Sequence, residues 1–190
     1  GAMLVGGQFF PWTGSTAFAV RAADTGWRGI DALVPQYQAK SVYEYKAVQD
    51  AYQFNPSNQI AADSSGNAYY ANTAPVPNLD DSQRAACTVP GGLDGSRSQC
   101  MWKTDSDAAG PGIFGPGNMP SLIRTDFASN MNDSHWLANP FAPLTGFDSS
   151  LGSVGTARSF RTRSGLVQVL DRISGTDGKG PPRFTLEQLQ

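Results

Sequence analysis

The long segment from Thr73 to Pro120 places the strongest constraint on the fold, because it shows no sustained helical or strand periodicity. Glycine, proline and short polar residues, which favour turns, recur along its length. An irregular connection this long is unusual inside a small self-contained domain. We therefore expect the segment to cross the surface of something larger or to approach a functional site. Aromatic residues make up 11% of the 190-residue chain, which argues against disorder.

The sequence ahead of this segment predicts a strand followed by two helices. Alternation of large and small residues predicts a strand at Ser15–Ala23 that is covered on both faces. A helix is expected at Trp27–Lys40, and Ser41 with Glu44 forms a capping-box pattern that starts a second helix. The residues expected to face inward are Ile30, Leu33, Val34 and Tyr37 in the first helix and Val42, Tyr45, Val48 and Tyr52 in the second. We interpret Tyr45 and Tyr52 as core residues rather than as a ligand-binding wall.

Short strands and another helix are predicted on the two sides of the long segment. Asn58–Asp63 and Asn67–Asn72 predict two strands, and the glycine in the polar turn between them is a hairpin signal. An extended run is expected at Ile123–Ala128, and a helix capped by Thr156 is expected to run to about Ile173. Its inward residues are expected to be Leu166, Val169, Leu170 and Ile173. These elements indicate an α+β fold with antiparallel strands, flanking helices and long loops.

Three arginines lie in the first turns of the helix that begins near Thr156, namely Arg158, Arg161 and Arg163. Positive charge at a helix N-terminus opposes the helix macrodipole. We therefore expect these arginines to find acidic or carbonyl partners elsewhere, with a solvated basic face as the alternative for at least one of them. A last helix is expected to start within Phe184–Leu189.

The extended run at Ile123–Ala128 ends in a dense polar turn, Asn130–His135, that contains two asparagines. Asparagine and aspartate are poor strand formers and good turn formers. An asparagine side chain offers a neutral NH2 donor, which can stabilise a developing oxyanion without carrying a charge. The turn is therefore a candidate catalytic feature, although most such turns are only structural. We interpret His135 as a structural hydrogen-bonding residue rather than as a general base.

Several functions are excluded by composition and motif context. The net charge is −2 without runs of one sign, so the chain shows no basic surface for nucleic acid and no basic amphipathic stripe for membranes. Gly110–Gly115 matches the dinucleotide-binding glycine pattern, but no strand is predicted before it, and neighbouring prolines disfavour a following helix. A single histidine and the lack of a G-x-S-x-G motif make a serine-hydrolase triad improbable.

The two cysteines, Cys87 and Cys100, lie in the long irregular segment. Free thiols would be ordinary in a cytosolic protein, whereas a disulfide would suit an exported one. A disulfide across a loop of this length would contribute roughly 3 kcal/mol of stability in the chain-entropy model. Two cysteines with one distant histidine do not form a zinc pattern. We favour the disulfide.

Asp105 and Asp107 resemble the beginning of a calcium-binding loop. Ala109 occupies the third acidic position, however, and no glutamate follows at the required distance. Calcium is therefore a minor alternative, and no cofactor is expected.

Several segments together resemble the β subunit of penicillin-acylase-type N-terminal-nucleophile hydrolases. Within that family, the aculeacin, echinocandin and acyl-homoserine-lactone acylases are the most similar branch. The most specific motifs are NMNDSHWLANP, at Asn130–Pro140, and RTR, at Arg161–Arg163. The segments that carry the resemblance are Phe10–Asp24, Asn58–Leu79, Leu93–Cys100, Pro111–Phe147 and Arg158–Gln190.

The resemblance implies a fold and a place within a larger protein. Residues 4–190 are expected to be a single, incomplete domain, an internal segment of an acylase β subunit that follows a tag remnant at residues 1–3. The family's αββα sandwich would then be only partly present. The expected partners are the rest of the β subunit, the α subunit of the same precursor, and a small acyl-amide substrate.

The resemblance also implies a mechanism. Family members attack the amide with the N-terminal serine of the β subunit, whose α-amine serves as the base, and Gly1 shows that this serine is not part of the chain. The family's oxyanion asparagine best matches Asn132, with Asn130 as the second choice, and its arginine beside the site best matches Arg161. The whole protein is expected to deacylate lipopeptide, acyl-homoserine lactone or penicillin-like amides.

Two further expectations complete this interpretation. The chain alone is expected to be inactive, and the native protein is expected to be periplasmic or secreted. The alternative is a non-catalytic binding or scaffold module that has the same fold.

Overall fold

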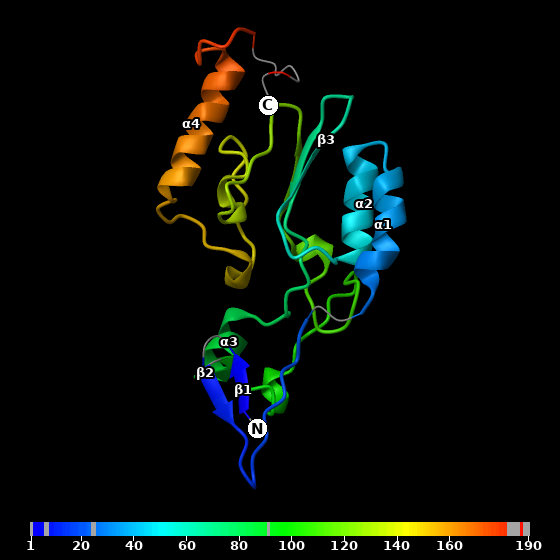
Figure 1. Ribbon diagram of the computed structural model, residues 1–190, viewed down its shortest axis with the longest axis vertical. Coiled ribbons are helices and arrows are strands. Elements are labelled where there is room, and N and C mark those ends of the chain that lie inside the picture. The colour runs from blue at the N-terminus through cyan, green and yellow to red at the C-terminus, as the bar shows by residue number, and fades with distance from the viewer. Residues whose placement is uncertain (1, 6–7, 24–25, 91, 182–186, 188–190) are drawn as a thin grey trace.

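The computed structural model describes residues 2–5, 8–23, 26–90, 92–181 and 187, and it has an elongated shape (Figure 1). Helices α1 and α2 lie on one side of the β3–β4 hairpin, and helix α4 lies on the other side, beyond an irregular segment. Helix α3 and the β1–β2 hairpin lie toward the opposite end of the molecule from the carboxyl terminus. The predicted helix start within Phe184–Leu189 falls almost entirely outside the described residues.

The central sheet has three antiparallel strands in the order β3–β4–β7. Strands β3 (Gln59–Ala62) and β4 (Ala68–Ala71) form the predicted hairpin, which pairs Ile60 with Tyr70. Strand β7 (Ser121–Arg124) pairs with β4 and is shorter than the extended run expected at Ile123–Ala128. The chain leaves the sheet directly after β7 and enters the segment that contains the polar turn.

Helix α2 (Val42–Tyr52) covers one face of this sheet. Its predicted N-cap is confirmed, because the Ser41 side chain accepts a hydrogen bond from the backbone N–H of Glu44. Val42 is buried, and the ring of Tyr45 packs edge-on against Tyr69, with 6.0 Å between the ring centres. The interpretation of the α2 apolar stripe as core is confirmed for Val42 and for Tyr45, which packs against the core, whereas Val48 and Tyr52 are only half-buried.

Helix α1 (Arg28–Gln38) contacts α2 rather than the sheet. The prediction of a helix here is confirmed, but the prediction that its apolar stripe faces inward is wrong. Only Ala32 is buried, and each residue of the stripe is at least 44% exposed. The exposed stripe consists of Ile30, Leu33, Val34 and Tyr37. The α1 stripe is thus an apolar surface that nothing among the described residues covers.

The strand expected at Ser15–Ala23 is also absent, because this segment is irregular and largely exposed. A strand needs a partner for its backbone N–H and C=O groups, and no described strand pairs with this segment. The nearby hairpin instead joins β1 (Ala2–Val5) to β2 (Gln8–Pro11). This hairpin was not predicted, because residues 1–3 were expected to be a tag remnant and β1 begins at Ala2.

The segment Thr73–Pro120 is mostly irregular, as predicted, but it contains helix α3 (Asp81–Cys87). A complete capping box between Asp80 and Gln83 starts this helix. The disulfide Cys87–Cys100 then ties its end to the short 3-10 helix η1 (Ser98–Cys100), which confirms the expected pairing. The remaining short elements are β5 (Thr88–Val89), β6 (Gly92–Leu93) and the 3-10 helix η2 (Pro116–Asn118).

Helix α4 (Phe160–Ser174) begins later than expected, because Ser159 rather than Thr156 caps it. The Ser159 side chain accepts the backbone N–H of Thr162, and Gly175, in the left-handed conformation, ends the helix. Leu166 is buried as predicted, but Ile173 is 42% exposed, which corrects its expected inward orientation. Two 3-10 turns, η3 (His135–Leu137) and η4 (Ser149–Leu151), precede α4.

The described elements confirm the α+β class with antiparallel strands, flanking helices and long loops. The αββα sandwich stays a prediction. Within the described residues, no helix has the length and apolar character required to cross a membrane.

Candidate active-site turn

The polar turn Asn130–His135 is closed by the side chain of its first residue. The Asn130 Oδ1 atom accepts the backbone N–H of Asn132 at 2.7 Å and that of Asp133 at 3.3 Å. Its Nδ2 atom donates to the carbonyl oxygen of Asp133 at 3.0 Å. Asparagine often closes turns by bonding to the backbone two or three residues ahead. The Asn130 amide thus bonds within the turn through its oxygen and through one N–H of its NH2 group.

Asn132, in contrast, carries an exposed side chain on a left-handed backbone with φ of 60°. Asparagine tolerates this conformation better than most residues. Its Oδ1 atom accepts a hydrogen bond from Arg161 Nη2 at 3.4 Å. Its Nδ2 atom donates to no atom among the described residues. The amide is therefore oriented through its oxygen, and its NH2 group is left for an acceptor from outside.

Asp133 links this turn to the start of α4. Its Oδ1 atom lies 2.9 Å from Arg158 Nη1, and its Oδ2 atom accepts the hydroxyl of Thr162 at 2.7 Å. These bonds, with that from the backbone N–H of Ser134, hold the pKa of the Asp133 carboxyl below its usual value; the Thr162 bond contributes most. Arg158 also stacks over the ring of Trp136, with 5.3 Å between the guanidinium carbon and the ring centre. The side chain of Arg158 is only 5% exposed, so this ion pair is shielded from solvent.

His135 closes the far side of the turn and is 1% exposed. Its Nδ1 atom lies 3.1 Å from the carbonyl oxygen of Leu151, so Nδ1 carries the proton and donates it there. The ring packs edge-on against Phe147, with 5.4 Å between centres. Burial lowers the pKa of His135, and the charge of Arg158 adds to this effect. His135 therefore lies in the interior as a neutral anchor, which agrees with its interpretation as a structural residue.

Each predicted site residue can now be placed. Asn132 and Arg161 meet although 29 positions separate them, and Asn130 and His135 hold the turn from either side. The expectation that the helix arginines find acidic or carbonyl partners is confirmed for Arg158, which binds Asp133 and the carbonyl of Thr156. Asp133 and Thr162 were not predicted from the sequence as parts of the site. The need of Arg158 for an acidic partner was the signal that could have pointed to Asp133.

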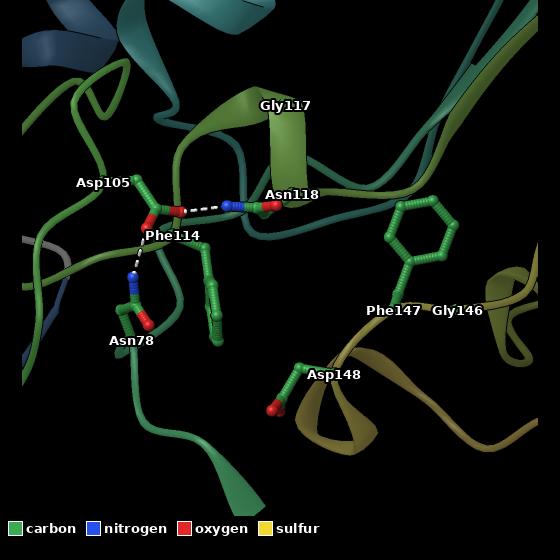
Figure 2. A pocket seen from close by; sticks show the side chains of 8 residues that line it. All are labelled: Asn78, Asp105, Phe114, Gly117, Asn118, Gly146, Phe147 and Asp148. Carbon is green, nitrogen blue, oxygen red and sulfur yellow. Dashed lines mark hydrogen bonds between the residues drawn. The ribbon is translucent and has the colours of Figure 1, made fainter.

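A second polar cluster lies in a pocket of about 360 Å³ beside Phe147 (Figure 2). Asp105 accepts hydrogen bonds there from the side-chain amides of Asn78 and Asn118, both at 2.7 Å, and from the backbone N–H of Gly115 at 2.9 Å. Figure 2 shows Asp105 between the two amides. The carboxylate of Asp105, which resembles the beginning of a calcium-binding loop, thus has both oxygens occupied by hydrogen bonds from the protein.

The neighbouring carboxylate, Asp107, accounts for the glycine at position 115, the last glycine of the dinucleotide-like pattern. Asp107 Oδ2 accepts the backbone N–H of Gly117 at 2.8 Å, and a Cβ atom on Gly115 would lie 1.8 Å from Asp107 Oδ1. No α-helix or strand flanks Gly110–Gly115, so the structure agrees with the rejection. Across the described residues, no group of three or more histidine, cysteine or acidic side chains could hold a metal ion.

Comparison with known proteins identifies the family to which this α+β chain and its amide-bearing turn belong. The family model described as penicillin amidase matches residues 3–190. The chain is 44% identical to aculeacin-A acylase from Actinoplanes utahensis over 95% of the chain and 25% of that protein. It is 36% identical to acyl-homoserine lactone acylase PvdQ from Pseudomonas putida over 94% of the chain and 22% of that protein. The corresponding PvdQ from Pseudomonas syringae pv. syringae is 34% identical over 94% of the chain and 23% of its own length.

The chain therefore belongs to the penicillin amidase family, as its resemblance indicated. The named relatives are acylases, and the chain spans about a quarter of their length.

Proposed function

We propose that the protein containing this chain is an N-acyl amide hydrolase, and that Asn132 donates its side-chain NH2 group to the oxyanion of the reaction. The single observation that carries this proposal is the free NH2 group of Asn132, whose amide is oriented through its oxygen by Arg161. The other asparagine of the turn is the weaker candidate, because one N–H of Asn130 Nδ2 already binds a backbone carbonyl. Family membership and the acylase relatives support the same reaction.

The attacking group in this proposal is the N-terminal serine of a β subunit of the N-terminal-nucleophile type, which this chain does not contain. The serine hydroxyl adds to the amide carbon, and its own α-amine, with an unperturbed pKa of about 7.7–8.0, accepts the proton. The amide oxygen then carries a negative charge that a neutral amide donor stabilises. Loss of the amine gives an acyl-serine, which water hydrolyses. The chain by itself is expected to be inactive.

The proposed substrates are lipopeptide, acyl-homoserine lactone or penicillin-like amides. The names of the relatives, aculeacin-A acylase and acyl-homoserine lactone acylase, and that of the penicillin amidase family support a substrate of this general kind. The proposed partners are the rest of the β subunit and the α subunit of the same precursor. The exposed α1 stripe supports this, because contiguous apolar surface on a helix is typical of an interface. The Cys87–Cys100 disulfide supports a periplasmic or secreted location, where disulfides persist.

The test is to replace Asn132 with glycine in the full-length protein. Glycine removes the amide donor while tolerating the left-handed backbone. We expect kcat to fall by about 10²–10³-fold, which is typical of the loss of one oxyanion donor. Asn118→Gly is the matched control, because it removes an equivalent amide whose NH2 group binds only Asp105.

The control variant is expected to keep kcat within about two-fold, since Asn118 makes its bond inside the fold rather than to a reacting atom. Equal activity of the Asn132→Gly variant and the unmodified protein would contradict the proposal. That result would favour the alternative of a non-catalytic binding or scaffold module.

A further inference from the structure

Most side chains of the polar turn form hydrogen bonds within the protein, but the side chain of Asn132 keeps an NH2 group that donates to nothing among the described residues. The hydrogen-bonded groups are those of Asn130, Asp133, Ser134 and the Nδ1 atom of His135. The Nε2 atom of His135 also has no partner among the described residues, but it is buried, whereas the side chain of Asn132 is exposed. An exposed side chain in such a turn would sample many orientations unless its backbone were fixed. The position of Asn132 therefore depends on what holds the residues next to it.

The side chain of Asp133, the next residue, links the turn to the start of α4 by hydrogen bonds, in addition to the Asn132–Arg161 contact. It binds Thr162, in the first turn of the helix, and Arg158, which lies just before the Ser159 cap, so its two partners stand on either side of Arg161 in the sequence. Thr162 is 4% exposed, and the guanidinium of Arg158 is held in turn by the Thr156 carbonyl at 3.1 Å. Both ends of this link are therefore rigid.

We propose that Asp133 is a positioning residue that sets the distance and orientation of the Asn132 amide relative to Arg161. This inference rests on the proposed function of Asn132. Asp133 has no contact with a reacting atom in this scheme, because both its oxygens point toward α4. The Asn132 Oδ1 to Arg161 Nη2 distance of 3.4 Å is at the long end of hydrogen bonding, so that contact alone orients the amide weakly. The shorter bonds of Asp133 provide the firmer constraint.

The test is a double-mutant cycle in the full-length protein with Asp133→Asn and Asn132→Gly. Asparagine keeps the shape of the side chain but loses its charge and one acceptor, so we expect kcat to fall by about 10- to 100-fold with KM within about two-fold. If Asp133 acts through Asn132, the same substitution made in the Asn132→Gly background costs almost nothing more. A merely structural role would lower activity by the same factor in both backgrounds.

Asp126→Asn is the matched control, because Asp126 is an acid in the same segment with a comparable set of bonds, to Arg124 and Asn139. Its effect is expected to be independent of Asn132. Thr162→Val is a second variant for use if Asp133→Asn fails to fold. It removes only the hydroxyl that binds Asp133, and it is expected to show a smaller loss of kcat with the same dependence on Asn132.

The outcomes separate this inference from the proposed function. Loss of activity in Asn132→Gly without loss in Asp133→Asn overturns the positioning role alone. Loss in Asp133→Asn with full activity in Asn132→Gly, or full activity in both, overturns both proposals. Equal losses for Asp133→Asn in the two backgrounds also overturn the positioning role.

Discussion

Two clusters of asparagine and aspartate side chains stabilise irregular segments of this chain, and they differ in one respect. Around Asp105, the amides of Asn78 and Asn118 donate to the carboxylate inside the fold. In the polar turn, the Asn132 amide accepts from Arg161 but donates to nothing among the described residues. The residue types are the same, so composition does not distinguish a structural cluster from a candidate site. The difference is whether a donor is left over when the internal bonds have been made.

Substitutions in a cluster whose amides donate inside the fold should lower the free energy of unfolding, whereas loss of an amide with a free NH2 group should lower catalytic activity. The predictions below test this distinction, beginning with the largest expected effect on the free energy of unfolding.

Replacing Asp105 with alanine should destabilise the chain by about 2–3 kcal/mol, because two amide donors and one backbone N–H lose their charged acceptor. Asn118→Ala, which removes only one of these bonds, should cost about 1 kcal/mol. Urea unfolding of the two variants gives both values. Similar small costs for both would mean that the cluster is not a cooperative structural unit.

Stability should fall as the pH is lowered below about 6.5, the ordinary pKa of histidine. Burial lowers the pKa of His135 in the folded state, so the unfolded chain binds the proton more tightly there. The slope should reach at most about 1.4 kcal/mol per pH unit, and the stability is lost between pH 6.5 and the lower pKa of the folded state. His135→Gln should flatten the pH dependence of urea unfolding in this window. Parallel curves for the two proteins would show that His135 does not titrate as expected.

Asn132→Ala should be about 1 kcal/mol less stable than Asn132→Gly, because alanine is strained at φ of 60°. The Gly variant itself should have nearly unchanged stability, since the lost amide makes only one long bond inside the fold. The control is Gln168, exposed in the middle of α4, where alanine should instead be more stable than glycine. The same order at both positions would rule out the left-handed conformation of Asn132.

Gly115→Ala should have the smallest effect, about 0.5–1 kcal/mol. The new methyl group would displace the flexible side chain of Asp107, which then loses its bond to the backbone of Gly117. In an Asp107→Ala background the same change should cost nothing, because φ of Gly115 is −79° and suits alanine. A cost that persists in that background would place the close contact elsewhere.

Local signals predicted several elements correctly. The hairpin of β3 and β4, the Ser41 cap and the end of α4 near Ile173 all follow from residues adjacent in sequence. Helix α3 was not predicted although Asp80 and Gln83 form a capping box, because glycines and prolines, which favour turns, surround this short helix. The strand expected at Ser15–Ala23 was wrong because alternation predicts an extended backbone but does not supply a partner.

The same difference between local signals and long-range contacts applies to the candidate site. The sequence identified Asn132, Arg161 and the need of Arg158 for an acidic partner. It did not identify Asp133 as that partner, because the contact joins residues 25 positions apart.

The sequence by itself determined the family, the helix and hairpin signals and the asparagines that could serve as donors, since each of these depends on residue identity or short-range spacing. Only the tertiary structure decided which amide keeps a free NH2 group and which helix face is covered. Hydrogen-bond satisfaction and burial depend on groups brought together from distant parts of the chain. The same asparagine chemistry is thus structural beside Asp105 and available at Asn132.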